Sequence, residues 1–414
     1  MIKKTLSSLL ITATLSITLG AQSAGAEDLG ITAFYGDKAL GRVVVMDVDK
    51  MTFKDEVYTQ GIDPYPVDQA GDLDKVYAIT RGSNSIDVID SNTLEPLALI
   101  KLPHYPRSSE AYNATLGLQL VTGVDKPMAT LIDVVADKAV ASVGLNEIFS
   151  VEDYGGSNAT GHPFWFDKNK FALIDRPNRV IHMYAVSVRK NGSVRTRLKS
   201  STPTPTAVHH FVKRATNDNT YYALSEGAPA LDIAPSILKY KLKYGKLNFV
   251  AEVPLATENA FEMGSHHADM HPDGIHMYVG STEGNVYVLN INKMKVVKTI
   301  PAGLGAGHTT FVPERNLAII TNHKDTYISI VDTKSHTLIK NVTVSGPQIN
   351  DAILQSHSTF VHPDMDFFYA FATDNGVFYE LNLETLEVSR SVETGGTPLQ
   401  GTFMCQGEGC ENLM

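Results

Sequence analysis

The sequence Gly264-Ser-His-His-Ala-Asp-Met-His-Pro-Asp-Gly274 is followed at once by the short apolar run Ile275-His-Met-Tyr-Val279. A histidine that leads into such an apolar run is found again at Gly161-His162, Val208-His209, Gly307-His308 and Ser356-His357. The five histidines stand at nearly the same register relative to the segment that follows. This recurrence indicates a repeat protein in which equivalent units carry a histidine at an equivalent place.

A second repeated pattern is a run of about five residues with alternating apolar positions that often ends in Asp or Asn. Examples are Val43–Asp47, Ile86–Asp90, Val286–Asn290 and Tyr327–Asp332. Period-two alternation bounded by Gly, Asn, Asp and Pro is typical of β-strands. Further apolar segments precede and follow these runs, and the unit recurs roughly every 45 residues, which is the spacing of β-propeller blades.

We therefore predict an all-β fold, a single β-propeller of eight four-stranded blades. Seven blades is the alternative, because the segment 145–160 is irregular. Residues 31–59 supply three strands with no inner strand before them, and the segment 398–403 reads as an inner strand with nothing after it. We expect the two ends of the chain to share one blade and so to close the ring.

The first residues have the pattern of a secretory signal peptide: two lysines, an apolar run from Leu9 to Leu19, and the small residues Ala24-Gly-Ala26. The predicted division is a signal peptide at 1–26, a propeller at 27–404 and a C-terminal tail at 405–414. The apolar run is too short to span a bilayer, so we expect a periplasmic protein with no membrane span in its mature form.

Charge and cysteine content limit the classes of partner. Asp and Glu outnumber Lys and Arg by 45 to 35, and no Lys/Arg-rich stripe with interleaved aromatic residues is present, which argues against nucleic acid. Cys405 and Cys410 are the two cysteines of the chain. In an oxidising compartment we expect them to form a disulfide. A thiolate metal ligand pair is the alternative.

The geometry of a propeller gathers the repeated histidines. The inner strand of each blade lines the central channel, and the loop leading into it lies on the same face as the loop between the second and third strands. Imidazole is a common nitrogen ligand, and several imidazoles with one carboxylate suit Zn²⁺ or Cu²⁺ better than Mg²⁺ or Ca²⁺. The predicted metal ligands are His104, His162, His209, His267, Asp269, His308, His323 and His357. The alternative is that these histidines are structural and bond the backbone of a neighbouring blade.

The Tyr/Ile-x-Val-Ile-Asp strand endings and the turns Asp273-Gly274 and Asn375-Gly376 resemble the YVTN-type exported propellers, which are related to the haem d1 propeller of cytochrome cd1. The resemblance covers the mature chain and implies the fold. The chain is also similar in plan to the propeller-type periplasmic zinc chaperones of ABC zinc importers, which use propeller histidines including a His-His pair. It departs from them in having no acidic, His-rich N-terminal tail.

Three function classes follow. The first, which we favour, is a periplasmic protein that holds Zn or Cu for storage or delivery and is not itself an enzyme. The second is a metal- or haem-d1-dependent oxidoreductase, with Glu226, Asp269 or Asp374 as acid or base. The third is a metal-free scaffold that binds a ligand or a protein. We expect a monomer whose partner is a periplasmic metal-transport or electron-transfer protein.

Overall fold

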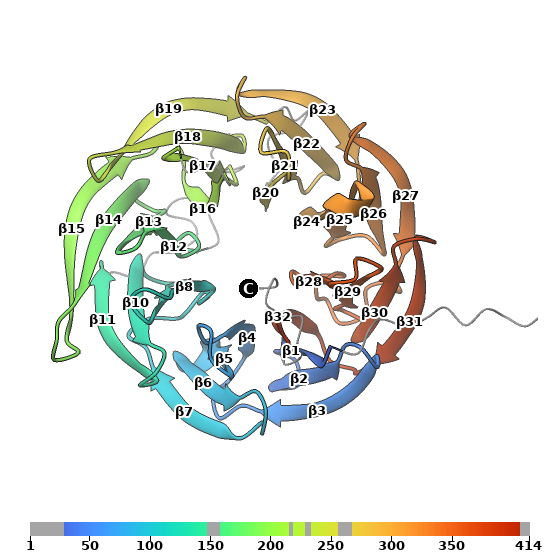
Figure 1. The fold of residues 1–414 in the computed structure, drawn as a ribbon, viewed down its shortest axis with the longest axis horizontal. Helices are drawn as coiled ribbons and strands as arrows, with labels where there is room; N and C mark the ends of the chain where they lie inside the picture. The colour runs from blue at the N-terminus through green and yellow to red at the C-terminus, as the bar shows by residue number, and fades with distance from the viewer. Residues whose placement is uncertain (1–28, 147–157, 215–217, 228–232, 256–266, 406–414) are drawn as a thin grey trace, which may run out of the picture.

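Eight four-stranded antiparallel sheets surround a central channel in the computed structural model of the chain (Figure 1). The structure describes residues 29–146, 158–214, 218–227, 233–255 and 267–405. The prediction of an eight-bladed propeller is confirmed, and the seven-blade alternative is wrong. The irregular segment that suggested seven blades connects two complete sheets, and residues 147–157 of it lie outside the described part.

Each blade runs from an inner strand at the channel to an outer strand at the rim (Figure 1). The inner strands are β4 (Pro64–Gln69), β8 (Ala111–Asn113), β12 (Phe164–Asp167), β16 (Val208–Lys213), β20 (Ala268–Met270), β24 (Ala306–Val312), β28 (Thr359–Val361) and β32 (Pro398–Cys405). The second strands are β5 (Lys75–Thr80), β9 (Leu118–Thr122), β13 (Lys170–Asp175), β17 (Thr220–Ser225), β21 (His276–Gly280), β25 (Leu317–Asn322), β29 (Phe367–Ala372) and β1 (Ile31–Asp37).

The two remaining strands of each blade complete the sheet. The third strands are β6 (Ser85–Asp90), β10 (Met128–Asp133), β14 (Val180–Val188), β18 (Ser236–Lys243), β22 (Asn285–Asn290), β26 (Tyr327–Asp332), β30 (Val377–Asn382) and β2 (Arg42–Asp47). The outer strands are β7 (Pro96–Lys101), β11 (Lys138–Gly144), β15 (Val194–Pro203), β19 (Lys246–Pro254), β23 (Lys295–Pro301), β27 (Thr337–Thr343), β31 (Glu387–Glu393) and β3 (Thr52–Tyr58). Short 3-10 turns, η1 (Arg81–Ser83) and η5 (Pro313–Arg315), occur within the described residues.

The core lies between neighbouring blades. The second strands and most of the third strands are buried on both faces, which explains their nearly continuous apolar sequences; the third strands β14 and β18 are partly exposed. One cluster, for example, joins Ile319 and Ile330 of one blade to Phe368 and Leu381 of the next. Each blade is therefore stabilised mainly by the two blades beside it, and the ring must close for all eight to be covered.

The ends of the chain close the ring as predicted. The sheet order β3-β2-β1-β32 places the C-terminal strand innermost in the blade that starts the chain, with Ile31 opposite Cys405. Cys405 is the last residue of β32, while Cys410 and the predicted signal peptide lie outside the described residues, so the disulfide and the cleavage site stay predictions. Within the described part, no helix is long and apolar enough to cross a membrane.

A buried ion pair joins the last full blade to the first. His362, after β28, has its Nε2 3.3 Å from Asp49 Oδ1 and its Nδ1 2.9 Å from Asp364 Oδ2. Burial opposes protonation of His362, but the two carboxylates outweigh it and raise its pKa. Burial favours the neutral form of Asp49 as well, but the hydrogen bond to His362 outweighs it and lowers the pKa of Asp49. The pair therefore favours the charged forms of both groups.

This pair predicts a pH dependence of stability. A histidine whose pKa is higher in the folded state than in the unfolded chain stabilises the fold below about pH 6.5, and that contribution is lost as the pH rises through the folded pKa. We expect the free energy of unfolding to fall between roughly pH 6 and 8, by at most about 1.4 kcal/mol per pH unit from this group. Urea unfolding of wild type and His362→Gln at pH 6, 7 and 8 checks this; an equal slope in both proteins contradicts it.

Candidate metal centre

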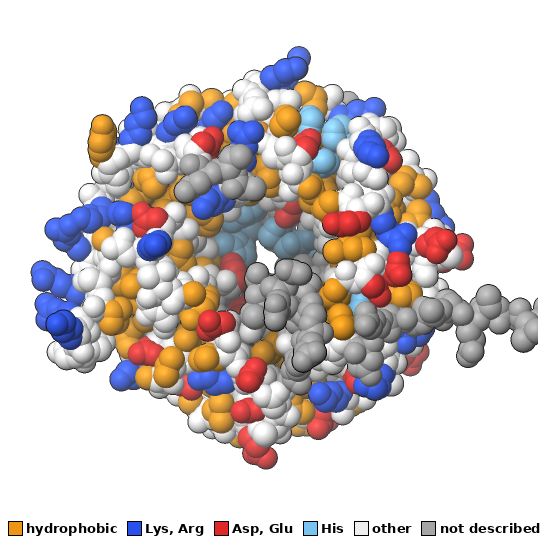
Figure 2. Space-filling model, in the orientation of Figure 1, with side chains coloured by type: hydrophobic (Ala, Val, Ile, Leu, Met, Phe, Trp, Pro, Cys, Tyr) orange, Lys and Arg blue, Asp and Glu red, His pale blue; other side chains and the backbone are white. Residues whose placement is uncertain are grey.

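Seven histidine side chains gather around the central channel, where Figure 2 shows pale-blue groups lining the opening. They are His162, His209, His210, His267, His308, His323 and His357. Five of them line a cavity of about 310 Å³ together with Tyr65, Arg81, Arg107 and Glu110. The repeated register of the sequence therefore does become a shared site in space.

The rings follow one another around the cavity wall. Centroids are 4.8 Å apart for His162 and His209, and 5.0 Å apart for His210 and His267. The next steps are 3.4 Å from His267 to His308 and 5.3 Å from His308 to His357. Histidines from five different blades are thus in contact through the channel, although they are up to 195 residues apart in sequence, from 162 to 357.

Three of these imidazoles form the best candidate for ion binding. One ligand atom from each of His308, His323 and His357 lies within 4.8 Å of the others. Two nitrogens bound to one tetrahedral Zn²⁺ at 2.0–2.1 Å would be roughly 3.4 Å apart. A shift of about an ångström in the side chains would bring this triad to coordination distance.

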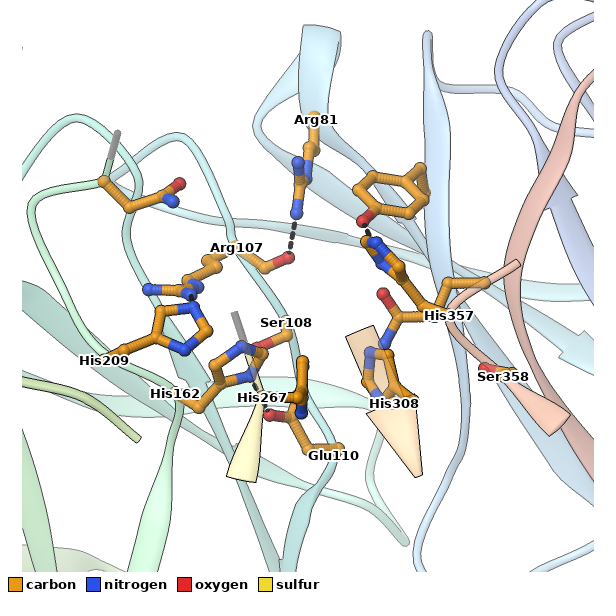
Figure 3. Close-up of a pocket in the computed structure, with 13 residues that line it drawn as sticks. Arg81, Arg107, Ser108, Glu110, His162, His209, His267, His308, His357 and Ser358 are labelled. Carbon is orange, nitrogen blue, oxygen red and sulfur yellow. Dashed lines mark hydrogen bonds and ion pairs between the residues drawn. The ribbon is translucent and has the colours of Figure 1, made fainter. Parts of the chain in front are cut away.

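The tautomer of His323 favours ligation. Its Nδ1 lies 3.0 Å from the carbonyl oxygen of Gln355, which can only accept, so Nδ1 carries the hydrogen. The lone pair is then on Nε2. His357 has its Nδ1 3.1 Å from the Tyr65 hydroxyl (Figure 3), and a phenol oxygen that accepts this N–H would likewise place the lone pair of the imidazole on Nε2. Such outer contacts orient metal-binding histidines in general.

The facing wall of the cavity carries charged groups. Glu110 accepts from Nδ1 of His162 at 2.5 Å, and Arg107 donates to Nε2 of His209 at 2.5 Å (Figure 3). Burial opposes ionisation of Glu110, but His162 lowers its pKa, so the carboxylate is charged at neutral pH. The other nitrogen of His209 lies 3.0 Å from Nδ1 of His210. Both nitrogens of His209 are therefore engaged by the protein, which makes it part of the wall rather than an obvious ligand.

Asp269 lies beside the triad but outside it. Its Oδ2 accepts from the backbone N–H of Thr309 at 2.9 Å, and burial raises its pKa to about 7. Near neutral pH the carboxyl group can thus be either protonated or charged. The other acid or base candidates are tied up structurally: Glu226 pairs with Arg176, and Asp374 accepts from the backbone of residues 349–352.

His104 is the one predicted histidine ligand that the structure does not bring to the cluster of seven histidines. It is 1% exposed, its Nε2 lies 3.0 Å from the Thr130 hydroxyl, and it packs under Gly123. Burial lowers its pKa to about 4, so it stays neutral. The reason is local: β8 begins only at Ala111, so His104 lies in a long connection and not at the start of an inner strand.

Sequence reasoning missed Tyr65 and His210. Strict alternation along a strand would turn adjacent histidines to opposite sides, and only His209 was expected at the channel. The pairing of β16 with β17 has a register shift between Val208 and His210, and β4 has one between Pro64 and Val67. Such bulges re-aim side chains at the ends of strands. The adjacent pair His209-His210 was the signal available in the sequence.

Comparison with known proteins confirms the architecture. No protein-family model and no functionally curated protein matches the sequence. Among solved structures, dihydro-heme d1 dehydrogenase NirN in complex with DHE is similar with a TM-score of 0.64 and 13% identity, over 94% of this chain and 78% of that one. Apo AztD from Citrobacter koseri is similar with a TM-score of 0.57 and 12% identity, over 91% of this chain and 99% of that one.

A third similar structure belongs to a protein whose own function is unknown. A functionally unknown protein from Desulfotomaculum acetoxidans matches with a TM-score of 0.54 and 12% identity, over 81% of this chain and all of that one. Likenesses at these identities show the propeller fold alone. Function has to be argued from the side chains of the site.

Proposed function

We propose that this protein is a periplasmic metal-binding β-propeller that holds one Zn²⁺ or Cu²⁺ ion for storage or delivery. The observation that carries the proposal is the triad His308, His323 and His357, whose ligand atoms lie within 4.8 Å of one another. Neutral imidazoles suit both metals, and no tight Mg²⁺ or Ca²⁺ site is built from nitrogen ligands. The predicted signal peptide supports the compartment, and the resemblance to zinc chaperones supports the role.

The geometry also favours a carrier. The triad is built on loops and strand ends of three places in two neighbouring blades, at the wall of an open channel. An ion held there by three imidazoles would keep one position for water or for a ligand from a partner. A partner that supplies a competing ligand could then take the ion without unfolding the propeller. The partner would be a periplasmic metal-transport protein.

Metal content tests the proposal. The protein is exported to a periplasm, purified without chelators or a histidine tag, and analysed by inductively coupled plasma mass spectrometry. We expect close to one Zn or Cu per chain, or uptake of one on titration. Circular dichroism checks that the protein is folded. If folded protein contains no metal and takes up neither ion, the proposal is wrong and a metal-free binding scaffold remains.

An oxidoreductase with a haem-d1-type cofactor is the second candidate. Two observations favour it: the similarity to NirN in complex with DHE, and an acid, Asp269, beside imidazoles in the channel. The absorption spectrum and the iron content of the same purified protein distinguish the two candidates. A visible absorption band with stoichiometric iron supports the second candidate, while a colourless protein that binds Zn²⁺ supports the first.

The hydroxyl of Tyr65 gives a finer prediction. Tyr65→Phe removes the group 3.1 Å from Nδ1 of His357 while keeping the ring. Loss of an outer partner of a metal-binding histidine lowers metal affinity about 10-fold to 100-fold, and we expect the lower end because two ligands are untouched. Competition with a chromophoric chelator measures the affinity. An unchanged dissociation constant would show that His357 is oriented by something else.

A further inference from the structure

Two outer hairpins of neighbouring blades lie side by side at the rim. The Ser200 hydroxyl donates to the carbonyl of Gly245 at 3.2 Å, and the Thr202 hydroxyl donates to that of Leu247 at 3.2 Å. These bonds hold β15 against the turn between β18 and β19. From Ser200, β15 runs six residues further to Val194, about 20 Å past that turn. Figure 1 shows the β14–β15 hairpin projecting at the left edge of the ring.

The two hairpins carry a concentration of positive charge that we call the basic strip. It consists of Arg189, Lys190, Arg195, Arg197, Lys199, Lys241, Lys243 and Lys246, all exposed. Figure 2 shows Lys and Arg side chains along the left edge, over β15. The sequence has no Asp or Glu between Asp175 and Asp218, nor between Asp232 and Glu252. A chain with a net charge of −10 thus has a local surface of the opposite sign.

The charges of the basic strip are not used inside the molecule. Across the described ranges, none of its eight side chains forms a hydrogen bond or an ion pair. Arg195 and Arg197 are two residues apart on β15 and, with Lys199 and Lys170, line one surface groove of about 390 Å³. The small residues Ala185 and Ser187 also line it. Like charges held so close together repel, so the strip costs stability unless something anionic binds it.

The other blades provide an internal comparison. Charged residues on outer strands protect sheet edges from pairing with other chains. The outer strand β3 combines Lys54 with Asp55 and Glu56, and β31 combines Arg390 with two glutamates. The outer strands β7, β11, β23 and β27 carry one or two lysines and no acid, and β15 carries three cations and no acid, the largest number of cations on any of the eight outer strands. Edge protection therefore does not require the excess seen on β15 and on the adjoining turns.

Apolar side chains accompany the basic strip. Tyr244, between Lys243 and Lys246 at the turn, is fully exposed, while Val188 beside Arg189 and Leu198 beside Lys199 are each nearly half exposed. Basic residues mixed with an exposed aromatic ring suit the headgroup region of a bilayer, where Lys and Arg meet phosphates and Tyr lies among the headgroups. An acidic protein segment would use the charges but would not need the exposed ring.

We propose that the basic strip docks this protein onto the surface of an anionic phospholipid bilayer. The histidines lie where the inner strands begin, and the turns between third and fourth strands lie at the other end of the blades. Docking through the strip therefore leaves the histidine end of the channel away from the lipid and open to a partner. Each Lys or Arg near such a surface is worth about fivefold in the partition coefficient, and the attraction is screened by salt.

Co-sedimentation with vesicles tests this proposal. The whole mature chain is mixed with vesicles of phosphatidylcholine alone or with 30% phosphatidylglycerol. We expect binding to the anionic vesicles only, with a loss of more than tenfold between about 0.05 and 0.5 M salt. The triple variant Arg195→Glu, Arg197→Glu, Lys199→Glu is expected to bind at least 50-fold less. Tyr244→Ser should weaken binding severalfold and leave the salt dependence unchanged.

The matched control is the equivalent hairpin two blades away. Lys293→Glu, Lys295→Glu, Lys298→Glu changes the net charge by the same amount at three exposed positions and should bind within about threefold of wild type. An equal loss in both triple variants would assign the effect to net charge and overturn the proposal. No vesicle binding, equal binding to neutral vesicles, or binding of a glutamate decapeptide without vesicle binding would overturn it too, the last in favour of an acidic protein partner.

Discussion

Replacing His323 by alanine is expected to lower the affinity for Zn²⁺ or Cu²⁺ by at least about 100-fold. His323 is the histidine whose tautomer the protein fixes, because its Nδ1–H is held by the carbonyl of Gln355. Its loss leaves two imidazoles of the triad, and two neutral ligands do not hold a divalent ion tightly against water. His308→Ala and His357→Ala should have effects of the same size.

The measurement is a competition titration with a chromophoric chelator, together with metal content after purification. His276→Ala serves as the control, because that histidine lies at the start of β21, at the other end of the blade, and bonds Asp273. It should keep one ion per chain at wild-type affinity. If His323→Ala remains folded and binds metal as tightly as wild type, the triad is not the site.

The propeller can be predicted from the sequence because the same pattern of short apolar strand segments recurs in each of the eight blades. Each blade needs two strands that are buried on both faces, and segments such as Leu118–Thr122 and Leu317–Asn322 show this as short apolar runs at a regular spacing. Closure through the termini is predicted from the same pattern, and the pairing of β1 with β32 confirms it. Repetition averages out the local irregularities that make a single strand hard to place.

The site is less predictable because it depends on details within single blades. His308 and His357 follow the common register and were placed correctly at the channel. His104 precedes an inner strand that starts seven residues later, so it is buried against Thr130 instead. His210 joins the histidine cluster through a bulge in β16, which strict alternation along a strand does not predict. The repeat specifies where side chains can gather, while bulges and loop lengths decide which of them do.

The ring closure carries the largest expected effect on stability. Asp37 is fully buried, accepts from Nε of Arg42 at 3.0 Å, and accepts from the backbone N–H of Thr397 at 2.9 Å. Arg42 is 5% exposed and also donates to the carbonyl of Thr394 at 2.8 Å. The pair therefore fastens the N-terminal strands of the shared blade to the segment that leads into the C-terminal strand.

Asp37→Asn is expected to lower the free energy of unfolding by about 1.5–3 kcal/mol, because Arg42 loses its buried charged partner and keeps Glu56 and the carbonyl of Thr394. Asp47→Asn, whose partner Lys50 is exposed, should cost no more than about 1 kcal/mol and is the matched control. Urea unfolding of both variants measures the difference. Because Asp37 also accepts from the N–H of Thr397, its replacement should loosen the segment that leads into β32, and limited proteolysis should then cut near residue 397 in Asp37→Asn but not in Asp47→Asn. Equal stability and equal resistance of the two variants would mean that the strand pairing of β1 with β32 closes the ring without this ion pair.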